Sequence, residues 1–76
     1  MNNSKKDLLL ITVRERVAQL NDEAGFQLFY LKVGRDRIIL RRNLCGTDTV
    51  VKKIRKGFWG LKWLLCTLQN INIVYT

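Results

Sequence analysis

The sequence predicts a small α+β domain in which two helices pack on one face of an antiparallel sheet of two or three strands. Apolar residues recur at helical spacing near the N-terminus and again in the second half of the chain. Between these segments lies a stretch with strand-like alternation around a turn. With 76 residues the chain is long enough for one domain, and we expect residues 1–76 to form it.

The first helix is predicted from about residue 5 to 22. Ser4 to Asp7 has the form of a capping box, with Asp where Glu or Gln is usual, and Gly25 is a stop signal. Three apolar residues lie off the main stripe, so a strand over residues 8–13 stays open as an alternative. The main stripe consists of Leu9, Val13, Val17 and Leu20.

A strand from Phe26 to Val33 is predicted next, followed by a hairpin at Gly34-Arg35. This dipeptide suits a two-residue type II′ turn, which needs a positive φ at its first position. The turn pairs Val33 with Asp36, Leu31 with Ile38, Phe29 with Leu40 and Gln27 with Arg42. The predicted core face carries Phe29, Leu31, Val33, Ile38 and Leu40, and the opposite face carries Leu28, Tyr30, Lys32, Arg37, Ile39 and Arg41.

A second helix is predicted over residues 49–69, after an N-cap at Thr47 or Asp48. Gly57 and Gly60 inside it indicate a close approach, a bend or a break into two shorter helices. The apolar stripe of this segment consists of Val51, Ile54, Phe58, Leu61, Leu65 and Leu68. Alternation at Ile71, Ile73 and Tyr75 predicts a short final strand.

The predicted order is therefore α-β-β-α-β. It is loosely similar to the α-β-β-β-α order of double-stranded-RNA-binding domains. Because we find no room for a third strand before the second helix, we assign the chain to no family.

The net charge of +8 is the most informative number in the composition. Residues 1–31 carry four basic and four acidic side chains, whereas residues 32–62 carry ten basic and two acidic ones. Such asymmetry favours a polyanionic partner, because solubility alone does not require one sign in one segment. We expect DNA or RNA, bound mainly through phosphates and with low sequence specificity.

Nine basic residues are the candidate nucleic-acid contacts, and three aromatic residues are candidates for base stacking or for an interface. The basic set is Lys32, Arg35, Arg37, Arg41, Arg42, Lys52, Lys53, Arg55 and Lys56; the aromatic set is Tyr30, Trp59 and Trp63. The two tryptophans fall on the polar side of the predicted helix. Burial under the first helix or under a second subunit is the alternative interpretation of the pair.

Two other classes of function stay open. An acidic protein partner or a homodimer would use the Trp59/Trp63 face, in the manner of a small inhibitor or adaptor. Peripheral binding to an anionic membrane would use the basic and aromatic segment from Lys52 to Leu65. We expect the membrane alternative less, because the strands need the apolar side of that segment as a partner layer.

Catalysis is not expected, and neither is a cofactor or a metal. The chain has no histidine, so the commonest general base and metal ligand is missing. Cys45 and Cys66 are too few for a zinc site, and without a secretory signal we expect both as free thiols in the cytoplasm or nucleoid. Cys66 is expected near the apolar side of the second helix, as a small hydrophobic residue.

Overall fold

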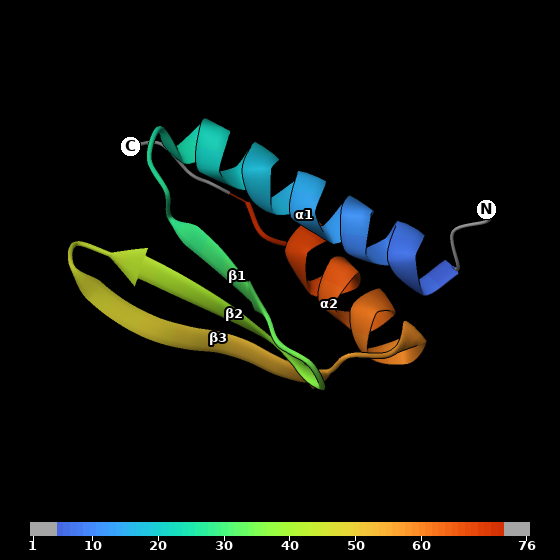
Figure 1. Cartoon of the computed structure of the whole chain (residues 1–76). Coiled ribbons are helices and arrows are strands. Elements are labelled where there is room, and N and C mark those ends of the chain that lie inside the picture. The colour runs from blue at the N-terminus through green and yellow to red at the C-terminus, as the bar shows by residue number, and fades with distance from the viewer. Residues whose placement is uncertain (1–4, 73–76) are drawn as a thin grey trace.

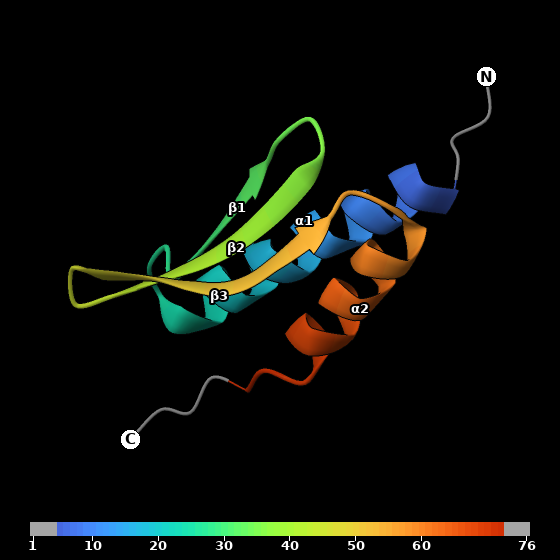
Figure 2. The ribbon, with the colours of Figure 1, turned by 90° about the horizontal axis from the view of Figure 1, so that it is seen from below.

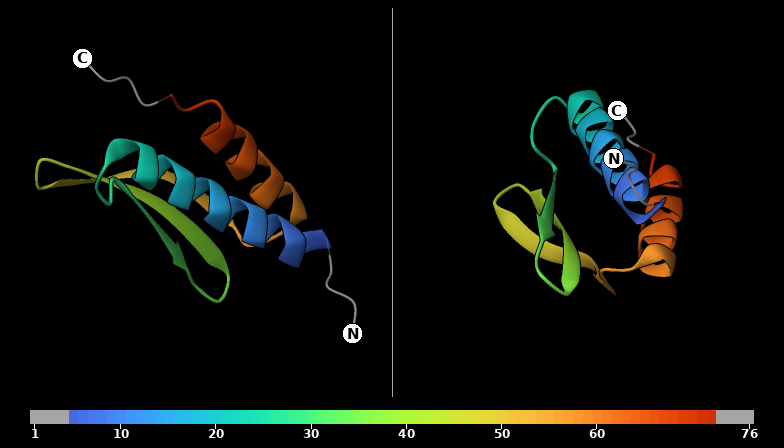
Figure 3. Two further views of the ribbon diagram at one scale, coloured as in Figure 1. Left: turned by 90° about the horizontal axis from the view of Figure 1, so that it is seen from above. Right: turned by 45° about the vertical axis from the view of Figure 1, so that its right-hand side comes forward.

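A computed structural model describes residues 5–72 and contains two helices and a three-stranded antiparallel sheet with strand order β1-β2-β3 (Figure 1). The elements are α1 (Lys5–Ala24), β1 (Phe29–Val33), β2 (Arg37–Leu44), β3 (Thr47–Arg55) and α2 (Phe58–Gln69). The predicted α+β class is confirmed, and both helices lie on one side of the sheet (Figure 3). The predicted order is wrong, because a third strand lies before α2.

α1 is helical from its first turn, so the alternative of a strand over residues 8–13 is wrong. Val13, Val17 and Leu20 are buried, as the apolar stripe predicts. The helix stops because Gly25 adopts a left-handed φ of 81°. Its N–H donates to the carbonyl oxygens of Asn21 and Asp22 at 3.0 and 3.2 Å. Ser4, the first residue of the expected capping box, lies outside the described residues.

The side chain of Asn21 fastens the end of α1 to the start of β1. Its Nδ2 donates to the carbonyl oxygen of Phe29 at 3.0 Å, and its Oδ1 accepts from the Phe29 N–H at 2.7 Å. The strand begins only at Phe29, later than predicted, because the Leu28 N–H bonds the Phe26 carbonyl at 2.8 Å in a tight turn. Leu28 is therefore buried in the core and not on the opposite face, where the sequence predicts it.

The β1–β2 register differs from the predicted one by two residues. Val33 pairs with Ile38 and not with Asp36. The tip is Arg35-Asp36 and not Gly34-Arg35, because the Gly34 N–H donates to the Arg37 carbonyl at 2.8 Å. Gly34 also lacks the positive φ that a type II′ turn requires. A two-residue shift leaves both faces unchanged, so the predicted core face of this hairpin is confirmed.

β3 replaces the first part of the predicted second helix. Cys45 and Gly46 have φ values of 53° and 82°, as a type I′ hairpin turn requires, and Leu44 pairs with Thr47 across it. Thr47 and Asp48 thus begin a strand and do not cap a helix. Five of the nine residues of β3 are β-branched, which favours a strand. These five are Thr47, Thr49, Val50, Val51 and Ile54.

A bulge divides β3 at Val51. Leu40 pairs with Lys52 but the next residue, Arg41, pairs with Val50, so Val51 has no partner of its own. At the bulge the apolar stripe of the predicted helix is not buried, since Val51 is 37% exposed. After it, Ile54 is buried against the helices.

α2 contributes Leu61, Leu64 and Leu68 to the core, where they meet the buried side of α1 and of the sheet. Gly60 marks a close approach, one of the alternatives that the sequence leaves open: a Cβ there would overlap the carbonyl oxygen of Arg55. Arg16 of α1 holds the far end of α2, with Nε donating to the Leu68 carbonyl at 3.2 Å and Nη2 to the Ile71 carbonyl at 3.3 Å. The two helices run side by side in the same direction (Figures 1 and 2).

Ile71 and Asn72 are not part of a strand. The remainder of the predicted final strand, with Ile73 and Tyr75, lies outside the described residues.

Candidate nucleic-acid interface

The sheet has one face that the helices do not cover (Figure 2). We call it the outer face. Because cross-strand partners share a face, the register assigns its residues directly. It consists of Tyr30 and Lys32 from β1, of Arg37, Ile39, Arg41 and Asn43 from β2, and of Asp48, Val50, Lys53 and Arg55 from β3.

The basic side chains of the outer face form rows across the strands. Arg37 lies directly opposite Arg55 at the end nearest the β1–β2 turn. In the next row, Lys32 and Lys53 flank Ile39 from either side. Like charges directly opposite each other across strands are destabilising, so the stability of the fold does not explain the pair of Arg37 and Arg55.

Tyr30 lies in the third row, beside Arg41 and Val50. Its side chain is 38% exposed, so part of the ring is accessible to a ligand. A shallow hollow of about 410 Å³ next to it is lined by side chains of all three strands. A second hollow of about 430 Å³ continues from Lys32 and Ile39 toward the β1–β2 turn. The outer face thus combines the aromatic ring of Tyr30 with a basic track, which consists of Lys32, Arg37, Lys53 and Arg55.

Among the described residues, Arg41 is the one basic residue of the outer face with an acidic partner. Its Nη2 lies 3.1 Å from Oδ2 of Asp48. Nε of the same side chain is buried and makes no hydrogen bond within the described part of the chain. The two basic rows nearest the β1–β2 turn contain no acidic side chain.

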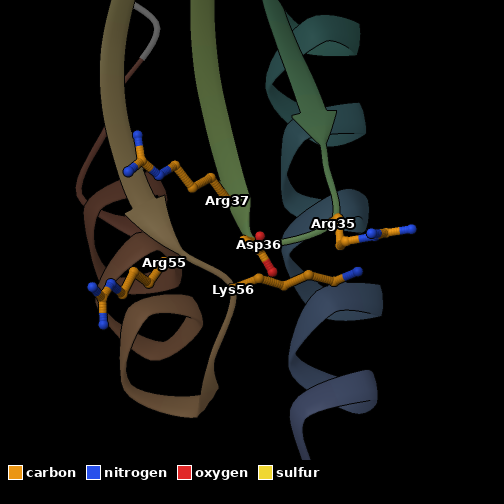
Figure 4. Close-up of a pocket in the computed structure, with 5 residues that line it drawn as sticks. All are labelled: Arg35, Asp36, Arg37, Arg55 and Lys56. Atoms are coloured by element: carbon orange, nitrogen blue, oxygen red, sulfur yellow. The ribbon is translucent and has the colours of Figure 1, made fainter.

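Arg35 and Lys56 extend the basic surface around the turn (Figure 4). The Lys56 N–H donates to the Asp36 carbonyl at 2.9 Å and joins the turn to the β3–α2 connection. Arg37 and Arg55 point to one side of this junction, whereas Arg35 and Lys56 point to the other. Together with Asp36 they line an open hollow of about 410 Å³.

Two of the nine basic candidates lie on the opposite side of the sheet, which faces the helices. Lys52 lies on the helix side of β3, and its Nζ sits 3.9 Å from the ring centroid of Trp63 in a cation–π contact. Arg42 pairs with Phe29, so it also lies on the helix side. Sequence reasoning misassigned Lys52 because it placed residues 49–56 on a helix.

Trp59 and Trp63 are exposed, by 74% and 63% of their surface, so the first helix does not bury them. They lie on α2 and not on the outer face of the sheet. Lys62 approaches the ring of Trp59 to 5.4 Å. Cys66 is exposed on the same side of α2, and the expectation that it serves as a small core residue is wrong. The reason is that the core stripe of α2 runs through Leu61, Leu64 and Leu68.

Comparison of the chain with family models, with curated proteins and with solved structures finds no significant match. Within residues 5–72, neither helix combines the length and the hydropathy that crossing a bilayer requires. The same residues contain no group of three or more Cys, Asp or Glu side chains placed to hold a metal ion.

Proposed function

We propose that the protein binds single-stranded nucleic acid on the outer face of its sheet, with low sequence specificity. One observation carries this proposal: an uncovered sheet face presents an exposed tyrosine next to four basic side chains that have no acidic partner within residues 5–72. Proteins that bind single strands without sequence preference combine a basic track for the backbone with aromatic side chains for the bases.

The rows give each side chain a role. Phosphates lie between Arg37 and Arg55 and along Lys32 and Lys53, where an anion relieves the repulsion between neighbouring cations. A base stacks on Tyr30, in the row where Asp48 already neutralises Arg41. Contacts to phosphates carry no sequence information directly, which is why low specificity follows.

The width of the sheet favours a single strand over the groove of a DNA duplex. Neighbouring strands lie about 4.8 Å apart, so three strands span roughly 10 Å before side chains are added. The major groove of B-DNA is about 12 Å wide and admits a helix or a two-stranded ribbon. The α-β-β-β-α order is, however, the order of double-stranded-RNA-binding domains. Element order alone does not establish a function, so duplex RNA is one of the probes in the test.

Lys52 and Lys53 provide a matched pair for the test, because they are adjacent in β3 and face opposite sides of the sheet. Each is replaced by Gln, so the change in net charge is the same. Binding of labelled single-stranded DNA and RNA, and of duplex DNA and RNA, is measured by fluorescence polarisation over a range of salt concentrations. We expect Lys53→Gln to lower the slope of log K against log salt by about 0.7 for a single strand. We expect Lys52→Gln to leave the slope unchanged.

The aromatic contact is measured with the same assay. Tyr30→Ala should weaken binding by about 1–3 kcal/mol, the usual contribution of one stacked base, and Tyr30→Phe should retain it. Circular dichroism shows whether each variant is folded. The proposal is overturned if the wild-type chain binds no probe at low salt, or if both lysine variants change the slope equally. Tighter binding to a duplex would refute the preference for single strands.

A further inference from the structure

The exposed surface of the helix layer is made of two stripes of opposite character. On α2 and its C-cap, the exposed residues Trp59, Trp63, Cys66 and Asn70 recur at spacings of four, three and four residues. On α1, the corresponding exposed stripe is Leu8, Ile11, Glu15, Ala18 and Asp22. Both stripes point away from the buried residues of their helices. Neither stripe belongs to the outer face, and Trp63 lies at the flank of α2 nearest β3, where Lys52 contacts it.

The apolar parts of the two stripes are too large to be ordinary surface residues. Trp59 and Trp63 are 74% and 63% exposed, and Leu8 and Ile11 are 51% and 46% exposed. All four residues belong to the halves of their helices nearest the N-termini. Since α1 and α2 run in the same direction, these halves lie at the same end of the helix layer (Figure 3). Large apolar side chains that stay exposed at the same end of two neighbouring helices are typical of an interaction site.

The charges of the two stripes are complementary. α2 contains no acidic residue. Its Lys62 lies 5.4 Å from the ring centroid of Trp59, and Lys52 of β3 lies 3.9 Å from that of Trp63. The exposed stripe of α1 contains Glu15 and Asp22 and no basic residue. An anionic membrane or a nucleic acid would attract the first stripe and repel the second. A suitable partner places an acidic stripe opposite α2 and a basic, aromatic stripe opposite α1. A second copy of this chain presents such a surface.

We propose that the helix layer is the interface of a two-fold symmetric homodimer. α2 of each copy packs across α1 of its partner, so that Trp59 and Trp63 of one copy cover the Leu8 and Ile11 of the other, and Lys62 lies near the acidic stripe. Four tryptophans that bury about 150–250 Å² each supply roughly half of the 1,200–2,000 Å² of a stable interface. The two outer faces then point in opposite directions and stay free for ligands.

Sedimentation velocity of the whole chain at rising concentration tests this proposal. The buffer contains a reductant, so that the exposed Cys45 and Cys66 do not cross-link. We expect a dimer for the wild-type chain and an increase in its dissociation constant of at least about tenfold for Trp63→Ala, as for a hot-spot tryptophan. A chain that stays monomeric into the high micromolar range would overturn the proposal.

A charge swap identifies the partner surface. Glu15→Lys and Lys62→Glu should each weaken the dimer, and the double variant should restore it, because the pair of opposite charges is recreated. Lys32→Glu, on the outer face, is the matched control and should leave the dimer unchanged. Failure of the double variant to recover would exclude this arrangement. If the wild-type chain is monomeric and binds vesicles of anionic lipid, the partner of this surface is a membrane and the dimer proposal is wrong.

Failure of this proposal is distinguishable from failure of the proposed function, because the two surfaces share no residue. The Trp63→Ala variant should bind single-stranded nucleic acid with an unchanged salt slope per protomer. The Lys53→Gln variant should dimerise like the wild-type chain.

Discussion

Gly60 shows how one residue fixes the junction between sheet and helix. A Cβ at this position would overlap the carbonyl oxygen of Arg55 and touch Cδ1 of Ile54 at 3.4 Å. Gly60→Ala gains helix propensity of about 1 kcal/mol. The overlap with a backbone oxygen should outweigh this gain, so we expect a net loss of about 1–3 kcal/mol in the free energy of unfolding. Urea denaturation followed by circular dichroism measures it.

The neighbouring glycine provides the control. Gly57 is the N-cap of α2 and has an extended backbone, and a Cβ added to it would meet nothing within 4 Å. Gly57→Ser should therefore stabilise the protein by a few tenths of a kcal/mol, because serine caps a helix somewhat better than glycine. A Gly60→Ala variant that is more stable than the wild type would show that α2 does not approach Arg55 closely.

At the scale of secondary structure, the β2–β3 turn decides the fold. Cys45 occupies a left-handed conformation, which costs an L-residue about 1–2 kcal/mol and asparagine much less. Cys45→Asn creates the favoured Asn-Gly dipeptide and should stabilise the protein by about 1 kcal/mol. Gly46→Ala should destabilise it by a similar amount through backbone strain alone, since a Cβ there meets nothing within 4 Å. Thermal unfolding measures both, and equal stabilities for the two variants would contradict a type I′ turn.

The same turn explains why the sequence predicts only part of the topology. The buried stripe of α1 and the core face of the first hairpin are predictable because each apolar period recurs over several residues, although a strand over residues 8–13 stays open and the hairpin register is wrong by two residues. The segment from Thr47 to Arg55 is ambiguous, since Val51 and Ile54 continue the helical spacing of Phe58 and Leu61 across two elements. The β-branched residues indicate a strand there. Cys45-Gly46, however, lacks the Asn or Asp that usually signals a type I′ turn, so the helical pattern prevailed.

For the whole molecule, the sequence predicts that a basic surface exists, but it predicts less well which basic residues share one face. Lys32, Arg37 and Arg41 are predicted on the outer side of the first hairpin, because a two-residue error in register does not exchange the faces. Lys53 and Arg55 join them only because β3 is a strand. On the predicted helix, Lys52 and Lys56 would instead lie next to each other on one face. The tryptophans lie on the polar side of α2, as the sequence predicts, because Leu61 and Leu68 belong to both the predicted and the observed core stripe.

The distribution of charge over the whole molecule leads to a gain-of-binding prediction. Asp48 is the acidic residue on the outer face and pairs with Arg41 at 3.1 Å, with both side chains partly exposed. Such exposed pairs contribute about 0–1 kcal/mol to stability, so Asp48→Asn should stay folded. It frees Arg41 for a phosphate, and we expect tighter binding of single-stranded nucleic acid with a salt slope steeper by about 0.7. Glu23→Gln on α1 changes the net charge equally but lies off the outer face, and should alter the slope little. Equal effects of the two variants would mean that total charge, and not the outer face, determines binding.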